Sequence, residues 1–318
     1  MRPRLLFSAP HDFLPETIAR FREEFDVELE EIWVADELPE QSEAEIWVVN
    51  PGQHFVVDAP VLARFPRLRV LATPSTGTNH IDARACEERG VLVRGLLDDR
   101  ASLDRISASA EFTFLLLLNS LRRLDTGLEE VAAGSWRRNE ERLRGYELEG
   151  RQAGLVGFGR IGGRLARYLA AFEATVRYYD PYVEAEGAVE RVASLPDLVR
   201  LSDVLVLCCS LTDETRGMVD GSLLAALPAG AIVVNTSRGE VLDETSVAAL
   251  LESRSDLAFA ADVLAGETDD THLESPLLAL ARTGRIVITP HIAGATVESQ
   301  EKAAEATLGL VREALVRP

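Results

Sequence analysis

Three ionisable side chains come just after predicted β-strands in the second half of the chain: Arg238, Glu267 and His291. In a parallel sheet the carboxyl ends of the strands share one edge, so the three side chains could meet at one bound ligand. A histidine exchanges protons near neutral pH, and a carboxylate beside it fixes its tautomer and favours its protonated form. A guanidinium can hold a substrate carboxylate through two hydrogen bonds. Hydride transfer between a hydroxy acid and a nicotinamide requires such a set, although each residue taken singly is also explained as a solvated charge or a packed side chain.

A glycine-rich turn has the spacing G-x-G-x-x-G at Gly157, Gly159 and Gly162. It follows the apolar pair 155–156 and precedes an amphipathic segment, 161–172, which predicts a strand, a tight turn and a helix. The first glycine permits the turn, the second lets the backbone approach a pyrophosphate, and the third lets the helix pack on the strand. The helix N-terminus adds N–H groups and a positive dipole end. The spacing alone is a weak signal, but in this context it predicts a dinucleotide site.

An acidic residue, Asp180, ends the next predicted strand, 175–179. A carboxylate roughly 20 residues beyond the glycine turn holds the ribose hydroxyls of a dinucleotide and repels a 2′-phosphate. We therefore predict NAD rather than NADP as the cofactor. The alternative is an ordinary exposed aspartate before Pro181.

The composition limits the kind of protein this can be. The chain has 318 residues, 47% of them hydrophobic, and a formal net charge of −19, which indicates a folded chain of about two domains. The charge argues against nucleic acid or an anionic membrane as a partner, and it fits a compositional bias and a high-salt cytoplasm equally well. No apolar stretch reaches membrane-spanning length, and the first residues turn polar too soon for a signal peptide. Three sparse cysteines predict neither a disulfide framework nor a zinc site, so we expect a reducing cytoplasm.

Predicted strands and helices alternate along the chain, which indicates an α/β fold with parallel sheets. Ligands of such sheets bind beyond the carboxyl ends of the strands, so the loops 50–53 and 75–78 are candidate ligand loops, although plain connections are equally expected there. A long apolar helix, 104–124, is expected to be buried between domains or subunits, and a charged helical arm, 126–146, to pack on a partner chain. The other predicted strands are 4–8, 30–34, 45–50, 68–72, 91–93, 203–208, 231–235, 257–262 and 285–289; the other predicted helices are 15–24, 195–202 and 244–252, and 98–103 is the predicted linker.

Several motifs in a fixed order resemble the D-isomer-specific 2-hydroxyacid dehydrogenase family, which includes D-3-phosphoglycerate, glycerate and D-lactate dehydrogenases. The resemblance covers the chain from about Leu68 to its end. Besides the glycine turn and the segments 75–82 and 109–111, the matching motifs are S-L-T-D-E-T-R-G at 210–217, N-T-S-R-G-E-V-L-D-E at 235–244, D-V with a glutamate at 262–267, and T-P-H-I-A-G-A-T at 289–296.

The resemblance implies a role for each matching position. Arg238 would bind the substrate carboxylate, His291 would be the acid–base residue, and Glu267 would pair with it, while Asp180 would hold the adenosine ribose. The cofactor site would be lined by Gly157, Gly159, Arg160, Ile161, Gly162, Thr212, Thr236, Ser237, Asp262 and Gly294, and the substrate would lie against Ser75, Thr76 and Gly77.

The same resemblance implies a fold of two doubly wound parallel-sheet domains. Residues 101–290 would form a Rossmann-type NAD domain, and residues 1–100 and 291–318 a flavodoxin-like, discontinuous substrate domain. The long helix and the arm would form a homodimer. The implied function is an NAD-dependent oxidoreductase that interconverts a small D-2-hydroxy acid and its 2-oxo acid. D-3-phosphoglycerate dehydrogenase and an NAD(H)-sensing co-repressor-like protein are the alternatives.

The chain departs from the family pattern at three places. Ser210 stands where proline is usual, and 95–105 lacks the N-x-P-x-x-N run that is common near the hinge. The phosphoglycerate enzymes usually present an arginine at the loop 50–53, whereas this chain has N-P-G-Q there, which weakens the case for a phosphorylated substrate. Glu267, by contrast, argues against the formate dehydrogenase branch, which has a glutamine.

Overall fold

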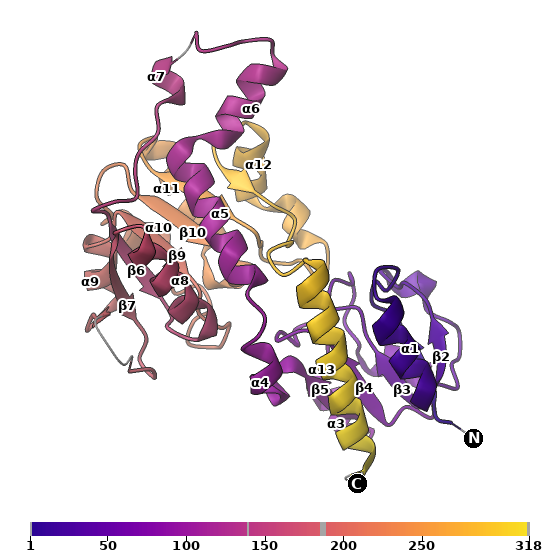
Figure 1. The fold of residues 1–318 in the computed structure, drawn as a ribbon. Coiled ribbons are helices and arrows are strands. Elements are labelled where there is room, and N and C mark those ends of the chain that lie inside the picture. The colour runs from indigo at the N-terminus through magenta and orange to yellow at the C-terminus, as the bar shows by residue number, and fades with distance from the viewer. Residues whose placement is uncertain (1, 139, 185–188, 317–318) are drawn as a thin grey trace. The chain divides into compact units, whose positions relative to one another are not determined.

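A computed structural model describes residues 2–138, 140–184 and 189–316. The chain forms two parallel sheets of five and seven strands, each flanked by helices (Figure 1). It divides into a first unit, 1–106 with 268–270 and 295–318, and a second unit, 107–267 with 271–294. The predicted α/β class with two parallel-sheet domains is confirmed.

The first unit packs helices on both faces of its sheet, whose strand order is β2-β1-β3-β4-β5. Successive side chains of a strand point to opposite faces. Trp47 of β3 therefore packs on one face, stacked on Phe65 with ring centroids 4.5 Å apart, and its neighbour Val48 packs on the other face with α1 and α13. The elements of this unit are β1 (Arg4–Phe7), α1 (Pro15–Glu24), β2 (Asp26–Leu29), η1 (Ala35–Glu37), β3 (Ile46–Val48), α2 (Ala59–Ala63), β4 (Val70–Thr73), α3 (Ala83–Glu88), β5 (Leu92–Gly95), η2 (Leu96–Asp98), α4 (Arg100–Leu103) and α13 (Val297–Val316).

One predicted strand of the first unit is wrong. The strand expected at 30–34 lies earlier, at Asp26–Leu29, because the chain turns back directly after α1 and the parallel pairing with β1 begins at Asp26. The segment 98–103, expected to be a hinge or linker, contains a short helix, and its role between the domains stays a prediction. Its helix α4 is capped by Asp99, whose carboxylate accepts a hydrogen bond from the Ser102 N–H at 3.0 Å.

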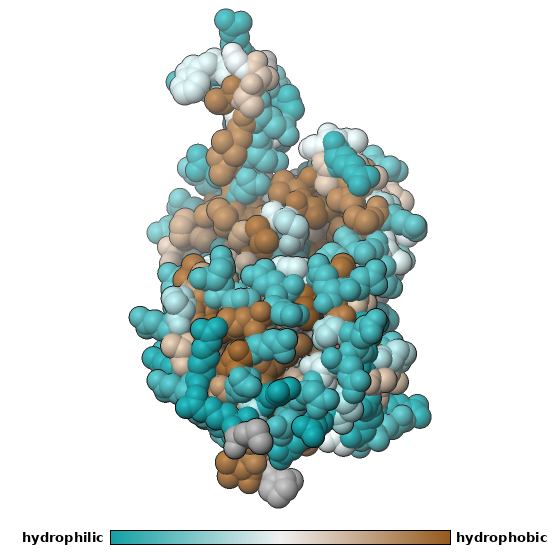
Figure 2. Space-filling model, turned by 90° about the vertical axis from the view of Figure 1, so that its right-hand side faces the viewer, coloured by the Kyte–Doolittle hydropathy of each residue, from teal (hydrophilic) through white to brown (hydrophobic). Residues whose placement is uncertain are grey.

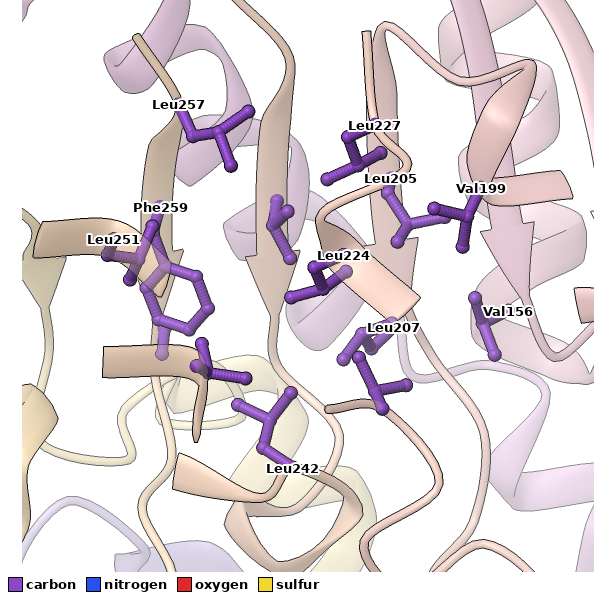
Figure 3. Close-up of a cluster of buried hydrophobic side chains, with 14 of the residues drawn as sticks. Val156, Val199, Leu205, Leu207, Leu224, Leu227, Leu242, Leu251, Leu257 and Phe259 are labelled. Carbon is purple, nitrogen blue, oxygen red and sulfur yellow. The ribbon is translucent and has the colours of Figure 1, made fainter. Parts of the chain in front are cut away.

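The second unit is a seven-stranded sheet in the order β12-β11-β10-β9-β6-β7-β8. Its strands β9 and β11 are apolar throughout because both faces of the sheet are covered, as parallel sheets require. On one face, Leu205, Leu207 and Phe259 pack against helices α9 to α12 (Figure 3), and helices α5 and α8 cover the other. The elements are α5 (Ala108–Arg122), α6 (Leu124–Ala132), α7 (Glu140–Leu143), β6 (Gln152–Val156), α8 (Arg160–Ala171), β7 (Thr175–Tyr179), β8 (Glu190–Arg191), α9 (Leu195–Arg200), β9 (Val204–Leu207), α10 (Gly221–Leu224), β10 (Ile232–Asn235), η3 (Gly239–Val241), α11 (Glu244–Ser253), β11 (Ala258–Ala261), η4 (Thr271–Glu274), α12 (Pro276–Arg282) and β12 (Val287–Ile288).

The helix expected at 104–124 is shorter, and the arm expected at 126–146 is only partly helical. Helix α5 ends at Arg122 because Arg123 adopts a left-handed conformation with φ of 52°, and α6 then starts in a new direction. In the arm, α6 stops at Ala132, and Gly134 follows with φ of 76°. Among the described residues, no helix is long and apolar enough to cross a membrane.

Candidate active site

His291 occupies a strained turn directly after β12. Its backbone has φ of 52°, in the left-handed region that non-glycine residues rarely adopt, and its N–H donates to the carbonyls of Asp262 at 2.8 Å and Thr289 at 3.0 Å. The imidazole Nδ1 lies 2.5 Å from Oε2 of Glu267. About half of the His291 side chain is exposed. Residues with a strained backbone are common at functional sites, where the surrounding structure holds a side chain in a required direction.

Glu267 is ionised and fixes the tautomer of His291. Burial would raise the pKa of Glu267, but the hydrogen bond and charge of His291, the Leu264 N–H at 2.8 Å from Oε1, and the charge of Arg238 outweigh it and lower that pKa. An ionised carboxylate can only accept hydrogen bonds, so Nδ1 of His291 carries the donated proton. Nε2 is then the nitrogen that exchanges a proton with a ligand.

Asp262, a predicted cofactor residue, anchors the His291 turn. It is 1% exposed. Its Oδ1 accepts hydrogen bonds from the Thr289 hydroxyl at 2.5 Å and the Ile292 N–H at 3.0 Å, and its Oδ2 accepts one from the Ala293 N–H at 2.7 Å. Burial raises the pKa of Asp262 although these bonds oppose the shift. The Asp262 side chain therefore binds residues on both sides of His291. A direct contact between Asp262 and the cofactor stays a prediction.

Arg238 follows a turn at the end of β10 that the side chain of the buried Asn235 stabilises. The Asn235 Oδ1 accepts hydrogen bonds from the N–H and hydroxyl of Ser237 at 3.0 and 2.7 Å, and its Nδ2 donates to the Arg238 carbonyl at 3.0 Å. The Arg238 guanidinium donates to the Ser237 carbonyl at 2.7 Å. Strands β10, β11 and β12 are neighbours, so the structure brings Arg238, Glu267 and His291 together at one sheet edge.

Thr236 is tied to helix α5 by a contact that the sequence did not predict. Its hydroxyl lies 2.6 Å from that of Thr113, and the Thr113 hydroxyl donates to the Ser109 carbonyl at 2.6 Å. A hydroxyl has one proton, so Thr236 is the donor to Thr113. This bond holds the β10 turn from 123 residues away, and an apolar helix pattern contains no signal for it.

Two of the three predicted glycines are required by the fold itself, and one is not. Gly157 has φ of 95°, and a Cβ there would lie 2.8 Å from the Cys209 backbone. A Cβ on Gly162 would lie 2.5 Å from the Gly157 carbonyl oxygen. A Cβ on Gly159 meets no protein atom within 4 Å, so the open side of the turn is at the second glycine.

Asp180 lies against this glycine turn. Its Oδ2 accepts a hydrogen bond from the Phe158 N–H at 2.8 Å, and its Oδ1 accepts from the N–H groups of Tyr182 and Val183 at 2.9 and 3.1 Å. The Tyr182 hydroxyl donates to Glu214, a contact that the sequence did not predict. Of the other predicted cofactor residues, Arg160 and Ile161 begin α8, Thr212 is exposed in the loop after β9, and Gly294 follows the segment that Asp262 holds.

The predicted substrate residues belong to the first unit. Ser75, Thr76 and Gly77 follow β4 and are half-buried, and the Ser75 hydroxyl oxygen accepts a hydrogen bond from the Gly77 N–H at 3.1 Å. The other candidate loop, 50–53, follows the neighbouring strand β3. Its Asn50 and Gln53 are buried and donate to the carbonyls of Ile32 and Phe55. Their substrate role stays a prediction.

Comparison with known proteins identifies the family. Residues 114–293 match the family model described as D-isomer specific 2-hydroxyacid dehydrogenase, NAD binding domain. The chain is 35% identical over 262 residues to D-3-phosphoglycerate dehydrogenase of Mycobacterium tuberculosis, covering 81% of this chain but 47% of that protein, so it spans about half the length of such relatives. It is 35% identical over 266 residues to (S)-sulfolactate dehydrogenase of Chromohalobacter salexigens, covering 81% of each.

A solved structure agrees with this family. The D-lactate dehydrogenase of Aquifex aeolicus, complexed with NAD and lactic acid, matches with a TM-score of 0.81 at 26% identity, over 98% of this chain and 95% of that one. The chain therefore belongs to the D-isomer-specific 2-hydroxyacid dehydrogenase family, and its second unit carries that family's NAD-binding domain.

Proposed function

We propose that the protein is an NAD-dependent oxidoreductase that interconverts a small D-2-hydroxy acid and its 2-oxo acid. The observation that carries this proposal is the His291 Nδ1 to Glu267 Oε2 hydrogen bond of 2.5 Å, close enough to Arg238 for its charge to act on Glu267. The family and the names of the relatives support the same reaction class.

Each residue of this set has a separate task. When bound, NAD would supply the acceptor for the hydride of the substrate carbon, and NADH would supply the hydride donor in the reverse direction. His291 takes the hydroxyl proton at Nε2, and the Glu267 carboxylate stabilises the resulting imidazolium. Arg238 holds the substrate carboxylate with two N–H groups and so keeps the hydroxyl at the imidazole. In the reverse direction His291 gives its proton to the oxo oxygen.

The residues present fit a dinucleotide. Gly159 leaves its side of the turn open, and α8 directs its first N–H groups to the same place. The carboxylate of Asp180 lies one hydrogen bond from the turn, where it would accept the ribose hydroxyls and repel a 2′-phosphate. We therefore expect a higher kcat/KM with NADH than with NADPH.

Exchanging Gly159 for alanine should weaken NADH binding without weakening the fold. The added methyl group meets no protein atom, but it would keep the pyrophosphate away from the backbone. Losing one charge-assisted hydrogen bond costs about 1.5–3 kcal/mol, which is about 10–100-fold in Kd. NADH fluorescence titration and thermal unfolding measure the two effects.

Gly163 is the matched control for this experiment, because a Cβ there also meets no protein atom within 4 Å. Gly163→Ala should leave NADH binding unchanged. Gly162→Ala should lower Tm, since its Cβ has no room. Equal loss of binding in the Gly159 and Gly163 variants would remove Gly159 from the pyrophosphate site.

An unphosphorylated substrate is favoured over 3-phosphoglycerate. The loop 50–53 carries no cationic side chain, and its buried Asn50 and Gln53 direct their amides to their own backbone surroundings. A phosphate needs a cationic or multiply donating site. D-3-phosphoglycerate dehydrogenase stays the second candidate because the chain is 35% identical to such enzymes.

We infer that two copies associate through the helical arm of the second unit. Leu124, Leu128 and Val131 lie on one face of α6, and each is more than half exposed. Figure 2 shows the hydrophobic surface that gathers on this arm, at the top of the view. Exposed apolar surface of this kind marks association sites. Leu128→Glu should convert a dimer into a monomer by analytical ultracentrifugation, and an unchanged mass would place the interface elsewhere.

The cysteines and the net charge bear on the location and the partners of the protein. Its three cysteines are free thiols, as a reducing cytoplasm maintains them, and cell fractionation would test that location. Its net charge of −19 disfavours nucleic acid as a ligand, which a gel-shift assay at low salt would test.

An assay of NADH oxidation with a panel of 2-oxo acids tests the function. The panel is glyoxylate, hydroxypyruvate, pyruvate, a branched 2-oxo acid and phosphohydroxypyruvate, at low and molar salt. Turnover with kcat/KM of about 10⁴ M⁻¹s⁻¹ or more on one acid would establish the dehydrogenase. Preference for phosphohydroxypyruvate would favour the second candidate. Tight NADH binding with no turnover on any acid would indicate a redox-sensing protein.

A further inference from the structure

Glu244 is a buried carboxylate that the proposed reaction does not use. It is the first residue of α11 and is 9% exposed. Its Oε1 accepts a hydrogen bond from the Ala265 N–H at 2.7 Å, and its Oε2 accepts one from the Ser275 hydroxyl at 2.6 Å. One side chain thus joins α11, the turn before Glu267 and the N-cap of α12.

The bond to Ala265 acts directly on the turn that carries Glu267. The preceding N–H, of Leu264, donates to the Glu267 Oε1 at 2.8 Å. The turn between these residues is therefore held by two carboxylates at consecutive N–H groups, one from Glu267 itself and one from Glu244. Movement of the Ala265 N–H would move the Glu267 carboxylate with it.

Gly239, the residue after Arg238, packs against the same peptide. A Cβ on Gly239 would lie 1.9 Å from the Leu264 carbonyl carbon and 2.0 Å from the Ala265 nitrogen. The Leu264–Ala265 peptide is therefore packed against Gly239 and bonded to Glu244, and its place determines the separation of Arg238 and Glu267.

Burying the Glu244 carboxylate costs free energy of folding, which is not expected for a residue that serves packing alone. Burial raises its pKa, and the nearby charges of Glu240 and Glu267 raise it further while its two hydrogen bonds oppose them. A buried carboxylate beside other carboxylates stabilises a fold less than an apolar residue of similar size would. Departures of this kind are expected where function constrains a position.

We propose that Glu244 is a positioning residue for the acid–base pair, which acts through Ala265 to hold the Glu267 carboxylate against His291 and beside Arg238. The proposal rests on the proposed function. Its prediction is that kcat depends on the bond to Ala265, whereas the bond to Ser275 serves stability only.

Three variants separate these two bonds. Glu244→Ala removes both and should lower kcat by about tenfold or more, since small displacements of reacting groups cost up to ~10²-fold, while KM for NADH stays near the wild-type value. Glu244→Gln should restore kcat, because its carbonyl accepts from Ala265 and its amide donates to the Ser275 hydroxyl. Ser275→Ala keeps the bond to Ala265 but loses the bond to Glu244 and the α12 cap, in which the Ser275 hydroxyl oxygen accepts from the Leu277 N–H at 3.2 Å. It should therefore lower Tm with little change in kcat.

A shorter side chain and a spectroscopic readout keep the test decisive. If Glu244→Ala does not fold, Glu244→Asp keeps the charge but withdraws the carboxylate, and it should lower kcat in the same way. The downfield proton NMR signal of the His291 Nδ1–H, assigned by its loss in His291→Ala, should be weakened in the Glu244→Ala or Glu244→Asp variant and kept in Glu244→Gln.

The outcomes distinguish this proposal from the proposed function. Wild-type kcat in the Ala or Asp variant, failure of Glu244→Gln to restore kcat, or an equal loss in Ser275→Ala would each overturn the role of Glu244. A wild-type protein without turnover on any acid would overturn the function instead. In that case the NMR signal alone decides whether Glu244 positions the pair, and a signal unchanged in the Ala and Asp variants would refute it.

Discussion

Replacing His291 with alanine is expected to lower kcat by about 10²–10⁴-fold, the usual contribution of a positioned acid–base group. The structure gives the reason: the Nδ1 proton is held by the ionised Glu267 at 2.5 Å, so Nε2 is the site that exchanges a proton with the substrate. Alanine removes that site but leaves the Asp262 anchor, whose bonds go to Thr289, Ile292 and Ala293. The turn should therefore stay folded.

Binding and chemistry should separate in this variant. NADH affinity, measured by fluorescence, should stay near the wild-type value, because the imidazole is not part of the glycine turn. Glu267→Gln is the companion variant: an amide cannot stabilise an imidazolium as a carboxylate does, so kcat should fall, but less than in His291→Ala. Near-normal turnover of His291→Ala would reject the acid–base role.

The sequence predicted the place of these residues because strand ends determine it. Hydrophobic runs locate buried strands well, and residues that directly follow parallel strands must share one edge. Arg238, Glu267 and His291 met there for that reason. The same logic found Asp180 beside the glycine turn, since the paired strands β6 and β7 end together.

The role of a side chain within a turn could not be predicted in the same way. Asp262 also follows a strand, and its buried carboxylate accepts hydrogen bonds from the backbone of the His291 turn, which its position in the sequence does not indicate. Glu244 and Thr113 act through bonds to residues 21 and 123 positions away, and no local pattern encodes such pairing. Composition and spacing show which groups are near an edge, while packing decides which of them face a ligand.

The predicted boundaries of helices and strands were wrong where backbone conformation or strand pairing, rather than hydrophobicity, determined the end of an element. The helical spacing of apolar residues continues on both sides of Arg123. The left-handed backbone of Arg123 nevertheless separates α5 from α6. The segment 30–34 has the composition of a strand, but the register with β1 is already used by Asp26–Leu29. Pairing partners and backbone reversals of this kind are tertiary properties that a single sequence does not display.

Replacing Arg238 with lysine is expected to lower kcat/KM by about 10²-fold or more, although the charge is kept. Lysine is a point charge and cannot make the two parallel N–H contacts that orient a planar carboxylate. Losing one hydrogen bond to a charged group costs about 1.5–3 kcal/mol, and misorientation of the hydroxyl at His291 adds to the loss. Both KM for the acid and kcat should therefore change, while the Kd of NADH should not.

The surroundings of Arg238 make this test specific. The Arg238 carbonyl accepts a hydrogen bond from the Asn235 side chain, and Gly239 packs on the Leu264–Ala265 peptide, so neither contact uses the Arg238 side chain. Lysine loses the guanidinium bond to the Ser237 carbonyl and keeps these two contacts of the turn. Arg254→Lys is the control, because Arg254 lies outside the site. Its guanidinium forms an ion pair with Asp256 at an N–O distance of 2.8 Å. This variant should change stability slightly and kinetics not at all. An Arg238→Lys enzyme with unchanged KM and kcat would show that the substrate carboxylate is bound by other groups.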